Sequence, residues 1–219
     1  MKSGDDYRRT NQTPADAPDS ATRARMKGFA QNFLEEFSEA ETEAALESFL
    51  DLFHPQFLEK NSHFVLSGDV CTKLGFIEKG VIRAYHATED GGEYTKTIFQ
   101  EDHFVAPLAS LTTGEPSPVG LQALTDVRIA VARYSDLERQ NRRFHALEHF
   151  TRMVIQWEWV RKEIREIRLV TLSAEERYDL FLEEFQGLEH RIPWYYIASF
   201  LGITPVALSR IRGRKRKTN

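Results

Sequence analysis

The chain has 219 residues, of which 41% are hydrophobic and 28% are charged, an ordinary composition for a globular protein in water. No stretch approaches the roughly 18 apolar residues of a membrane span, and no apolar signal segment follows a basic start. These features argue against membrane and secreted proteins and predict a cytoplasmic one. The single cysteine, Cys71, cannot form a disulfide or a cysteine-based metal site within the chain.

The charges are distributed unevenly along the chain. The formal net charge is −4, yet residues 190–219 contain seven Lys or Arg and no Asp or Glu. The other 22 basic residues and all 33 acidic residues give residues 1–189 a net charge of −11. A basic end on an acidic body favours contact with a polyanion, although a solvated basic tail gives the same pattern.

The N-terminal part is predicted to be a tail followed by helices. Residues 1–27 contain Pro14, Pro18 and few large apolar side chains, which is typical of a flexible tail. From Gly28 to Leu58 apolar residues recur at helical spacing, which predicts two helices that part near Ser38. Their apolar faces would be Phe29, Phe33, Leu34 and Phe37, and Leu46, Phe49, Leu50 and Phe53.

The region from residue 63 to residue 133 is rich in β-forming residues, in short runs separated by turn signals. Glu89-Asp90-Gly91-Gly92 predicts a hairpin, and Pro107–Leu111 one helical turn. Many short strands in one block predict an antiparallel β-roll, or jelly roll. The runs are His63–Leu66, Leu74–Ile77, Val81–Ala87, Tyr94–Phe99, His103–Val105, Val119–Leu124 and Val127–Ala132.

A long amphipathic helix is predicted next, at residues 146–172. Its apolar residues alternate at spacings of three and four, and charged residues flank them, which favours a seam against a second copy of the helix. The alternative is an ordinary amphipathic helix that packs on its own domain. The predicted dimer interface consists of Phe150, Met153, Trp157, Val160, Ile164 and Ile167, and Thr171 continues the seam.

A helix-turn-helix is predicted within residues 173–219. Ser173 and Glu176 form a capping box after a possible hinge at Thr171–Ser173. In the segment from Ile197 to Ile211, Ala198 is small where the helices cross, and Gly202 supplies the positive φ of the turn. Thr204 is suited to cap the second helix, and Leu208 and Ile211 to face its core. Such a helix pair alone is only moderately specific for DNA binding.

The second helix of this pair is predicted to contact DNA. Its outer face would present Thr204, Pro205, Val206, Ser209 and Arg210, while Arg212 and Arg214 lie nearer the basic run. Arg210 is the residue on this face that can bind guanine O6 and N7 through two hydrogen bonds. The basic run through Lys217 is suited to phosphate contacts.

The order of helices, β-roll, long helix and helix-turn-helix resembles the Crp/Fnr superfamily of bacterial transcription regulators. The segments that carry the resemblance are Leu74–Phe104 and Ile197–Ile211. It implies an α+β protein with a sensor domain at residues 28–145, a dimerisation helix at 146–172 and a DNA-binding domain at 173–219. It also implies a homodimer that binds palindromic double-stranded DNA, acts on RNA polymerase and responds to a small effector.

The sequence departs from the cyclic-AMP-binding members of that superfamily. Those members carry Gly-Glu-Leu, whose Glu binds the ribose, and a later Arg that pairs with the cyclic phosphate. Ungapped counting places Ala106-Pro107-Leu108 and Ser117 at these positions, and neither supplies the charge. Arg83 is the one nearby cation, with a surface salt bridge as its more ordinary role. Cyclic AMP is therefore not expected to bind in the usual way, and no cofactor is predicted. Pro205 and Val206 also replace the Arg and Glu that read bases in well-known members.

Two other function classes remain open. A β-roll also serves cupin-like metal enzymes, but His54, His63, His86 and His103 are scattered rather than clustered. His145 and His149 are one helical turn apart, a spacing more typical of a solvated helix face than of a metal site. No metal site and no enzyme are therefore expected, since no phosphate loop or catalytic triad stands out. The other class is an interaction module without DNA binding, which the helix-turn-helix pattern opposes.

Overall fold

The computed structural model of the chain describes residues 18–88 and 91–218. It begins with helices α1 (Ser20–Gln31) and α2 (Glu39–Leu50), and side chains of Asp19 and Ser38 accept hydrogen bonds that cap their first turns. The predicted break near Ser38 is confirmed. The predicted tail is wrong for residues 20–27, because Met26 is fully buried and anchors α1 to the core. Residues 1–17 of that predicted tail lie outside the described residues.

The segment after α2 is a strand, not the continued helix that the apolar spacing predicted. Strand β1 (His54–Leu58) pairs antiparallel with β8 (Val127–Arg133). Pro55 explains the error, since a proline disfavours helical geometry at the preceding residue and lacks an amide for the helix.

The described residues form eight strands in two four-stranded antiparallel sheets, as the sequence predicted for a β-roll. One sheet has the order β1-β8-β3-β6 and the other β2-β7-β4-β5. Glu89 and Asp90 of the predicted hairpin lie outside the described residues, but the Thr88 amide donates to the Gly92 carbonyl across that loop. The remaining strands are β2 (His63–Val65), β3 (Lys73–Lys79), β4 (Ile82–Ala87), β5 (Glu93–Phe99), β6 (Phe104–Val105) and β7 (Gly120–Ala123).

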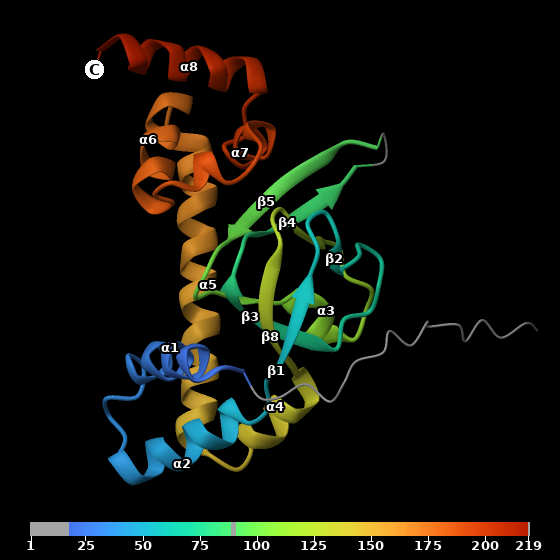
Figure 1. The fold of residues 1–219 in the computed structure, drawn as a ribbon, viewed down its shortest axis with the longest axis vertical. Coiled ribbons are helices and arrows are strands. Elements are labelled where there is room, and N and C mark those ends of the chain that lie inside the picture. The colour runs from blue at the N-terminus through green and yellow to red at the C-terminus, as the bar shows by residue number, and fades with distance from the viewer. Residues whose placement is uncertain (1–17, 89–90, 219) are drawn as a thin grey trace, which may run out of the picture.

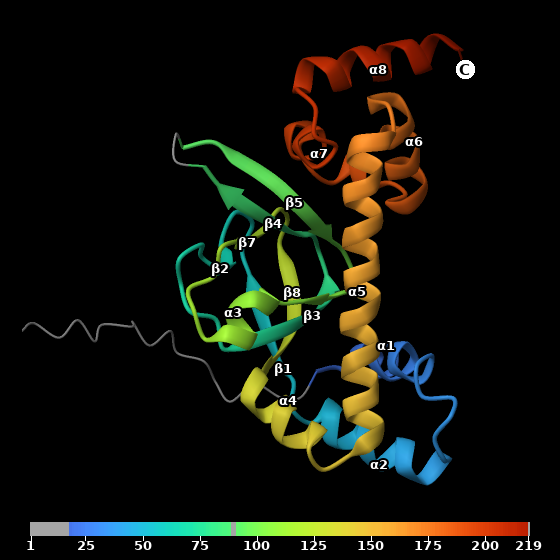
Figure 2. The same ribbon diagram turned by 180° about the vertical axis from the view of Figure 1, so that it is seen from behind.

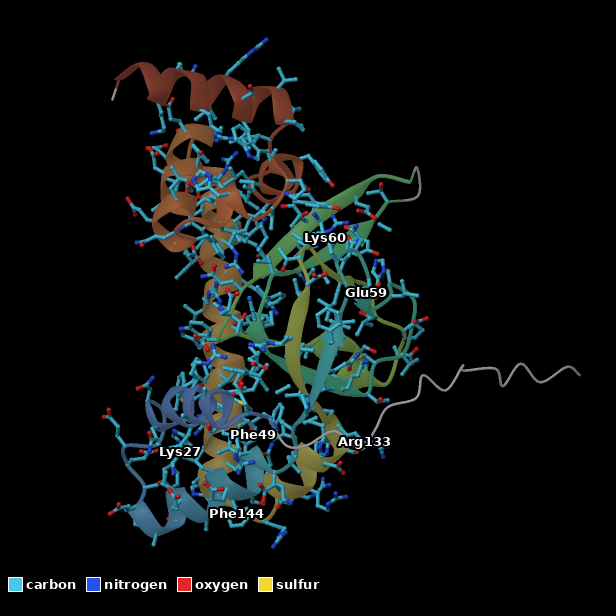
Figure 3. The ribbon with its side chains drawn as sticks, in the orientation of Figure 1. Lys27, Phe49, Glu59, Lys60, Arg133 and Phe144 are labelled. Carbon is cyan, nitrogen blue, oxygen red and sulfur yellow. The ribbon has the colours of Figure 1, made fainter. Side chains whose placement is uncertain are left out.

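The first sheet separates two hydrophobic cores, because alternate residues of a strand point to opposite faces. On β8, Val127 and Ile129 are buried between the two sheets, whereas Ala130 and Ala132 face the helices. Phe49 lies where α2 meets α5 (His145–Thr171), with its ring centroid 5.5 Å from that of Phe150 (Figure 3). Two short helices, α3 (Leu108–Thr113) and α4 (Tyr134–Asn141), complete this part of the fold.

Helix α5 links the β-roll to a C-terminal helical unit. The roll lies on one side of α5, with α1 and α2 near its beginning and the C-terminal helices around its end (Figures 1 and 2). The predicted capping box of Ser173 and Glu176 is present at the start of α6 (Ala174–Glu184). A short 3-10 turn at Leu188–His190 precedes α7 (Trp194–Phe200) and α8 (Pro205–Thr218). None of the helices in the described part combines the length and apolar character that crossing a membrane requires.

Candidate nucleic-acid interface and effector site

Helices α7 and α8 form the predicted helix-turn-helix. Ala198 is fully buried at the crossing, and Leu208 and Ile211 are buried beneath α8. Gly202 in the turn has a φ of 67°, and a Cβ there would lie 3.2 Å from Cδ2 of Leu169, so glycine suits both the conformation and the space. The Thr204 hydroxyl accepts a hydrogen bond from the Ala207 amide and caps α8, as predicted.

The predicted base-reading face of α8 is open to solvent. The side chains of Thr204, Pro205, Val206, Ser209 and Arg210 are exposed, with 61% of Val206 accessible. Helix α8 crosses the end of the molecule that is farthest from α1 and α2, near the end of α5 (Figure 1). An exposed second helix at one end of the fold has the geometry that major-groove entry requires.

The basic residues farther along α8 are engaged with the neighbouring helices. The Arg212 guanidinium stacks on the Trp194 ring of α7 and is half-buried. Arg214 forms an ion pair with Glu175 of α6 at 3.1 Å, and Lys215 forms one with Asp179 at 2.5 Å. Arg216 and Lys217 lie on α8, but their side chains are outside the described part. Arg212 and Arg214 would have to exchange these contacts to reach a phosphate.

Most of the predicted dimer seam on α5 is exposed. The exposed fractions are 39% for Trp157, 49% for Val160, 41% for Ile164 and 53% for Ile167, while Met153 is half-buried. Phe150 is an exception, with only 2% exposed. Its assignment to the interface is wrong because α1 and α2 reach this end of α5 and enclose its ring between Phe29, Phe33 and Phe49.

The residues predicted to form the effector pocket do not all lie at one site in the structure. Ala106 and Leu108 line an apolar cavity of about 120 Å³ between the β-roll, α3 and α5, and Pro107 lies between them at the residue before α3. Ser117 is instead buried in the loop before β7, where its hydroxyl donates to the Val119 carbonyl. Sequence reasoning missed most of the cavity wall, which includes Phe49, Leu74, Phe99, Phe104, Leu111, Tyr134, Leu137, Phe150, Val154 and Ile155.

Glu158 and Lys162 of α5 are the charged residues at the apolar cavity. A cavity of this size is comparable to those that hold a benzene-sized molecule, and it is smaller than the roughly 300 Å³ at which pockets for drug-sized ligands begin. The site as it stands therefore suits a small apolar group rather than a charged nucleotide.

Arg83, the proposed phosphate partner, belongs to a different cluster. Its side chain is 2% exposed and lies between the rings of Tyr85 and Tyr196, 4.4 and 4.1 Å from their centroids. Its guanidinium donates to the Gln122 amide oxygen and pairs with Glu93. The surface role expected for Arg83 is therefore also wrong, because α7 covers the sheet here and contributes Tyr196.

Further contacts join the β-roll to the helix-turn-helix. The Thr95 amide of β5 donates to the Ser199 hydroxyl of α7 at 2.8 Å. Arg191 forms a bidentate ion pair with Glu101, whose carboxylate also accepts from the Gly80 amide. Burial opposes ionisation of Glu101, but the hydrogen bonds from Arg191 and Gly80 outweigh it and lower the pKa to about 2. The two units are thus joined by polar contacts.

The histidines considered as metal ligands have other contacts. His145 and His149 both pack edge-on against Phe37, and His149 lies 2.9 Å from a Glu36 oxygen. Within the described residues, no group of three or more His, Cys, Asp or Glu side chains is arranged to hold a metal ion.

Comparisons with known proteins show which proteins share this fold. Residues 55–143 match the family model of the cyclic nucleotide-binding domain. FixK2 from Bradyrhizobium japonicum superposes with a TM-score of 0.69 at 16% identity, over 76% of this chain and 85% of that one. A putative transcriptional regulator of the Crp/Fnr family from Eubacterium rectale gives 0.61 at 17% identity, over 82% and 85%. The chain has the Crp/Fnr fold.

A third structure with the Crp/Fnr fold is the c-di-GMP responsive global regulator CLP from Xanthomonas campestris. It matches with a TM-score of 0.62 at 15% identity, over 80% of this chain and 92% of that one. No curated protein sequence matches the chain. The similarity in sequence is low throughout, so the Crp/Fnr fold is shared while the ligands and partners of this chain have to be argued from its own residues.

Proposed function

We propose that this protein is a transcription regulator that binds palindromic double-stranded DNA as a homodimer and responds to a small effector. The observation that carries the proposal is the exposed face of α8, because it sits on a helix-turn-helix whose internal positions are all packed. A metal enzyme lacks comparable support, since the histidines of the described residues form no cluster.

The exposed face of α8 predicts modest base readout. Val206 can contact a thymine methyl group but forms no hydrogen bond to a base, and Ser209 discriminates poorly between bases. Arg210 is therefore expected to provide most of the direct readout, about 1–3 kcal/mol for each half-site. Lys215, Arg216 and Lys217 would contribute phosphate contacts, which do not depend on sequence.

The exposed apolar stripe of α5 supports the dimer. Trp157, Val160, Ile164 and Ile167 repeat at spacings of three and four and are each at least 39% exposed. A second copy of the same stripe would bury these side chains in the manner of a coiled coil. A two-fold dimer would present two α8 helices, and half-sites about 34 Å apart, one turn of DNA, would let both enter the same face of the duplex.

The apolar cavity beside α5 is the proposed effector site. Its wall joins Phe104, Leu108 and Leu111 of the β-roll region to Val154 and Ile155 of α5. A ligand that fills it would contact the sensor and the proposed dimer helix at once. Because Lys162 is the only cation on this wall among the described residues and Arg83 lies in another cluster, the site favours an apolar effector over cyclic AMP.

Selection of binding sites from random duplex DNA, followed by salt titration, tests the proposal. The enriched site should be palindromic, and Arg210→Ala should weaken it far more than random DNA. Neutralising Lys215, Arg216 and Lys217 together should weaken both alike and flatten the dependence of affinity on salt. Arg142→Ala, which changes an exposed cation beside α4, is the control and should leave both affinities unchanged. Failure to enrich any sequence contradicts the proposed function.

A further inference from the structure

A second, larger cavity lies where the C-terminal half of α5 meets α6 and the turn between α7 and α8. Its volume is about 470 Å³, and it is separate from the apolar effector cavity except that Glu158 and Lys162 border both. We call it the junction cavity. Five cations line it, namely Arg161, Lys162, Arg165, Arg168 and Arg177, against three carboxylates, namely Glu158, Glu183 and Glu184.

The carboxylates of the junction cavity neutralise only part of this charge. Glu184 pairs with both Arg161 at 3.1 Å and Arg168 at 3.6 Å, and Glu158 also pairs with Arg161. Lys162 has no carboxylate within ion-pair distance among residues 18–88 and 91–218. The cavity therefore carries an excess of positive charge that its own acidic residues do not pair.

Two of the arginines bind only neutral oxygens in the part of the chain that the structure describes. Arg165 donates to the Phe200 carbonyl at 2.6 Å and to the Tyr94 hydroxyl at 3.1 Å. Its Nε atom is buried and has no hydrogen-bond partner there. Arg177 donates to the carbonyl oxygens of Leu201, Leu169 and Leu172. Neither guanidinium forms an ion pair with a carboxylate in this part of the chain, so an anion in the cavity would give both positive charges a partner.

The electrostatic potential around the junction cavity is also positive. Burial lowers the pKa of Lys96, and the nearby charges of Lys162 and Arg165 lower it further, while Glu166 acts in the opposite direction. Positive groups are thus close enough to disfavour one another. An anion bound among them would relieve this repulsion.

Apart from Thr97 of β5, the rest of the wall is apolar and aromatic. Leu169, Leu180, Phe181, Phe185 and Phe200 line the cavity beside the cations. The volume falls within the roughly 300–1,000 Å³ of typical small-molecule sites, and it is too small for a duplex. Guanidinium groups pair well with phosphate, and the apolar wall suits an organic body attached to it.

We propose that the junction cavity binds a phosphorylated organic anion of nucleotide size. The phosphate would lie against Lys162, Arg165 and Arg168, and the organic body against the apolar wall formed with Phe200. Because α5, α6 and the α7–α8 turn all contribute to the wall, the bound anion would hold the DNA-binding helices in one orientation relative to α5. This site is distinct from the apolar effector cavity and does not depend on it.

Calorimetric titration of the full chain without DNA tests this proposal. The probes are ADP and GDP, with pyrophosphate to represent the anion alone and adenosine to represent the organic body alone. At least one nucleoside diphosphate should bind more tightly than pyrophosphate, and adenosine should not bind. Raising the salt concentration should weaken the binding.

Charge-removing variants locate the binding site. Lys162→Gln should weaken nucleotide binding about ten-fold, the loss of one charge-assisted hydrogen bond, and Arg168→Gln should act in the same direction. Lys60→Gln, in the loop between β1 and β2 (Figure 3), is the matched control and should bind as the unaltered chain does. Thermal melting of each variant without ligand verifies folding.

Three results would overturn the proposal. The first is no binding of either nucleoside diphosphate. The second is equal affinity for pyrophosphate, which would leave the organic body without a role. The third is unchanged affinity in both folded cavity variants, which would place the bound nucleotide elsewhere. None of these results bears on DNA binding, so the proposed function would be judged separately by its own experiment.

Discussion

Arg83 illustrates how much of the fold rests on one buried cation. Its guanidinium is held by Gln122 and Glu93 and lies between the rings of Tyr85 and Tyr196. A buried charge is tolerated only when its hydrogen bonds are satisfied, and the aromatic faces add a favourable cation–π contribution. Because Tyr196 belongs to α7, Arg83 joins the β-roll to the C-terminal helical unit.

Replacing this residue should therefore be costly. Arg83→Met is expected to lower the free energy of unfolding by about 2–4 kcal/mol, since Gln122 loses its partner and the Glu93 pair is broken. The control, Arg128→Met, removes a cation that is 58% exposed and should change stability by less than about 1 kcal/mol. Urea unfolding measures both. Equal effects of the two variants would refute the structural role given to Arg83.

The residues at the usual nucleotide anchors predict weak binding of cyclic AMP. Pro107 directly precedes α3 and Ser117 is buried in its loop, so neither supplies the carboxylate or the guanidinium that the ligand needs. Two missing charge-assisted hydrogen bonds, each contributing about 1.5–3 kcal/mol, would weaken binding by a few orders of magnitude. Titration calorimetry with cyclic AMP should detect no micromolar binding at the apolar cavity. Competition by a small apolar ligand would distinguish that site from the junction cavity.

At the scale of elements, α5 carries the prediction of a dimer. Changing both Trp157 and Ile164 to Glu would place like charges opposite their own copies in an apolar seam, so the double variant should sediment as a monomer. Trp159→Glu is the control, because Trp159 is 70% exposed but lies outside the seam positions. It should remain dimeric. A monomeric unaltered chain at micromolar concentration would contradict the proposal.

The sequence predicted element types well where local signals were strong. Every predicted strand from His63 to Ala132 corresponds to a strand of the roll, and the capping box at Ser173 and the turn glycine Gly202 marked the C-terminal helices. It failed at α1 and β1 for different reasons. Residues 20–27 bury few side chains, so the apolar periodicity of a helix was weak there. At β1, the helical spacing of the surrounding apolar residues was given more weight than Pro55, which disfavours a helix.

The whole molecule is held together by a core that spans both units. Val81, Ile98 and Leu124 of the β-roll are buried in the same cluster as Phe181 and Leu208 of the helical unit. This shared core could not be predicted from the sequence, because its contacts join segments far apart in the chain. The buried position of Arg83 could not be predicted either, because a single arginine gives no periodic signal. The exposed face of α8 could be predicted because a single local motif encodes it, whereas the two cavities arise only from tertiary packing.

The ion pair between Glu101 and Arg191 joins the β-roll to the helical unit, and it predicts that the free energy of unfolding depends on pH. The pKa of Glu101 is lowered from 4.5 to about 2, so its stabilising contribution is present above pH 4.5 and is lost as pH falls towards 2. Glu101→Gln should reduce the free energy of unfolding at pH 7 by about 1–2 kcal/mol, after allowance for partial exposure of the pair. Thermal melts across this pH range should show the difference shrink in acid. A difference that is constant with pH would contradict the assignment.

The contact between Ser199 and the Thr95 amide has a consequence for the sheet itself. Strand β5 is at the edge of its sheet, and such an edge offers unpaired backbone groups to any other extended chain. Here α7 lies against that edge, and its serine hydroxyl accepts one of the free amides. A release of α7 from the roll would therefore uncover a template for strand addition, so the first helix of the helix-turn-helix also shields this sheet edge from other chains.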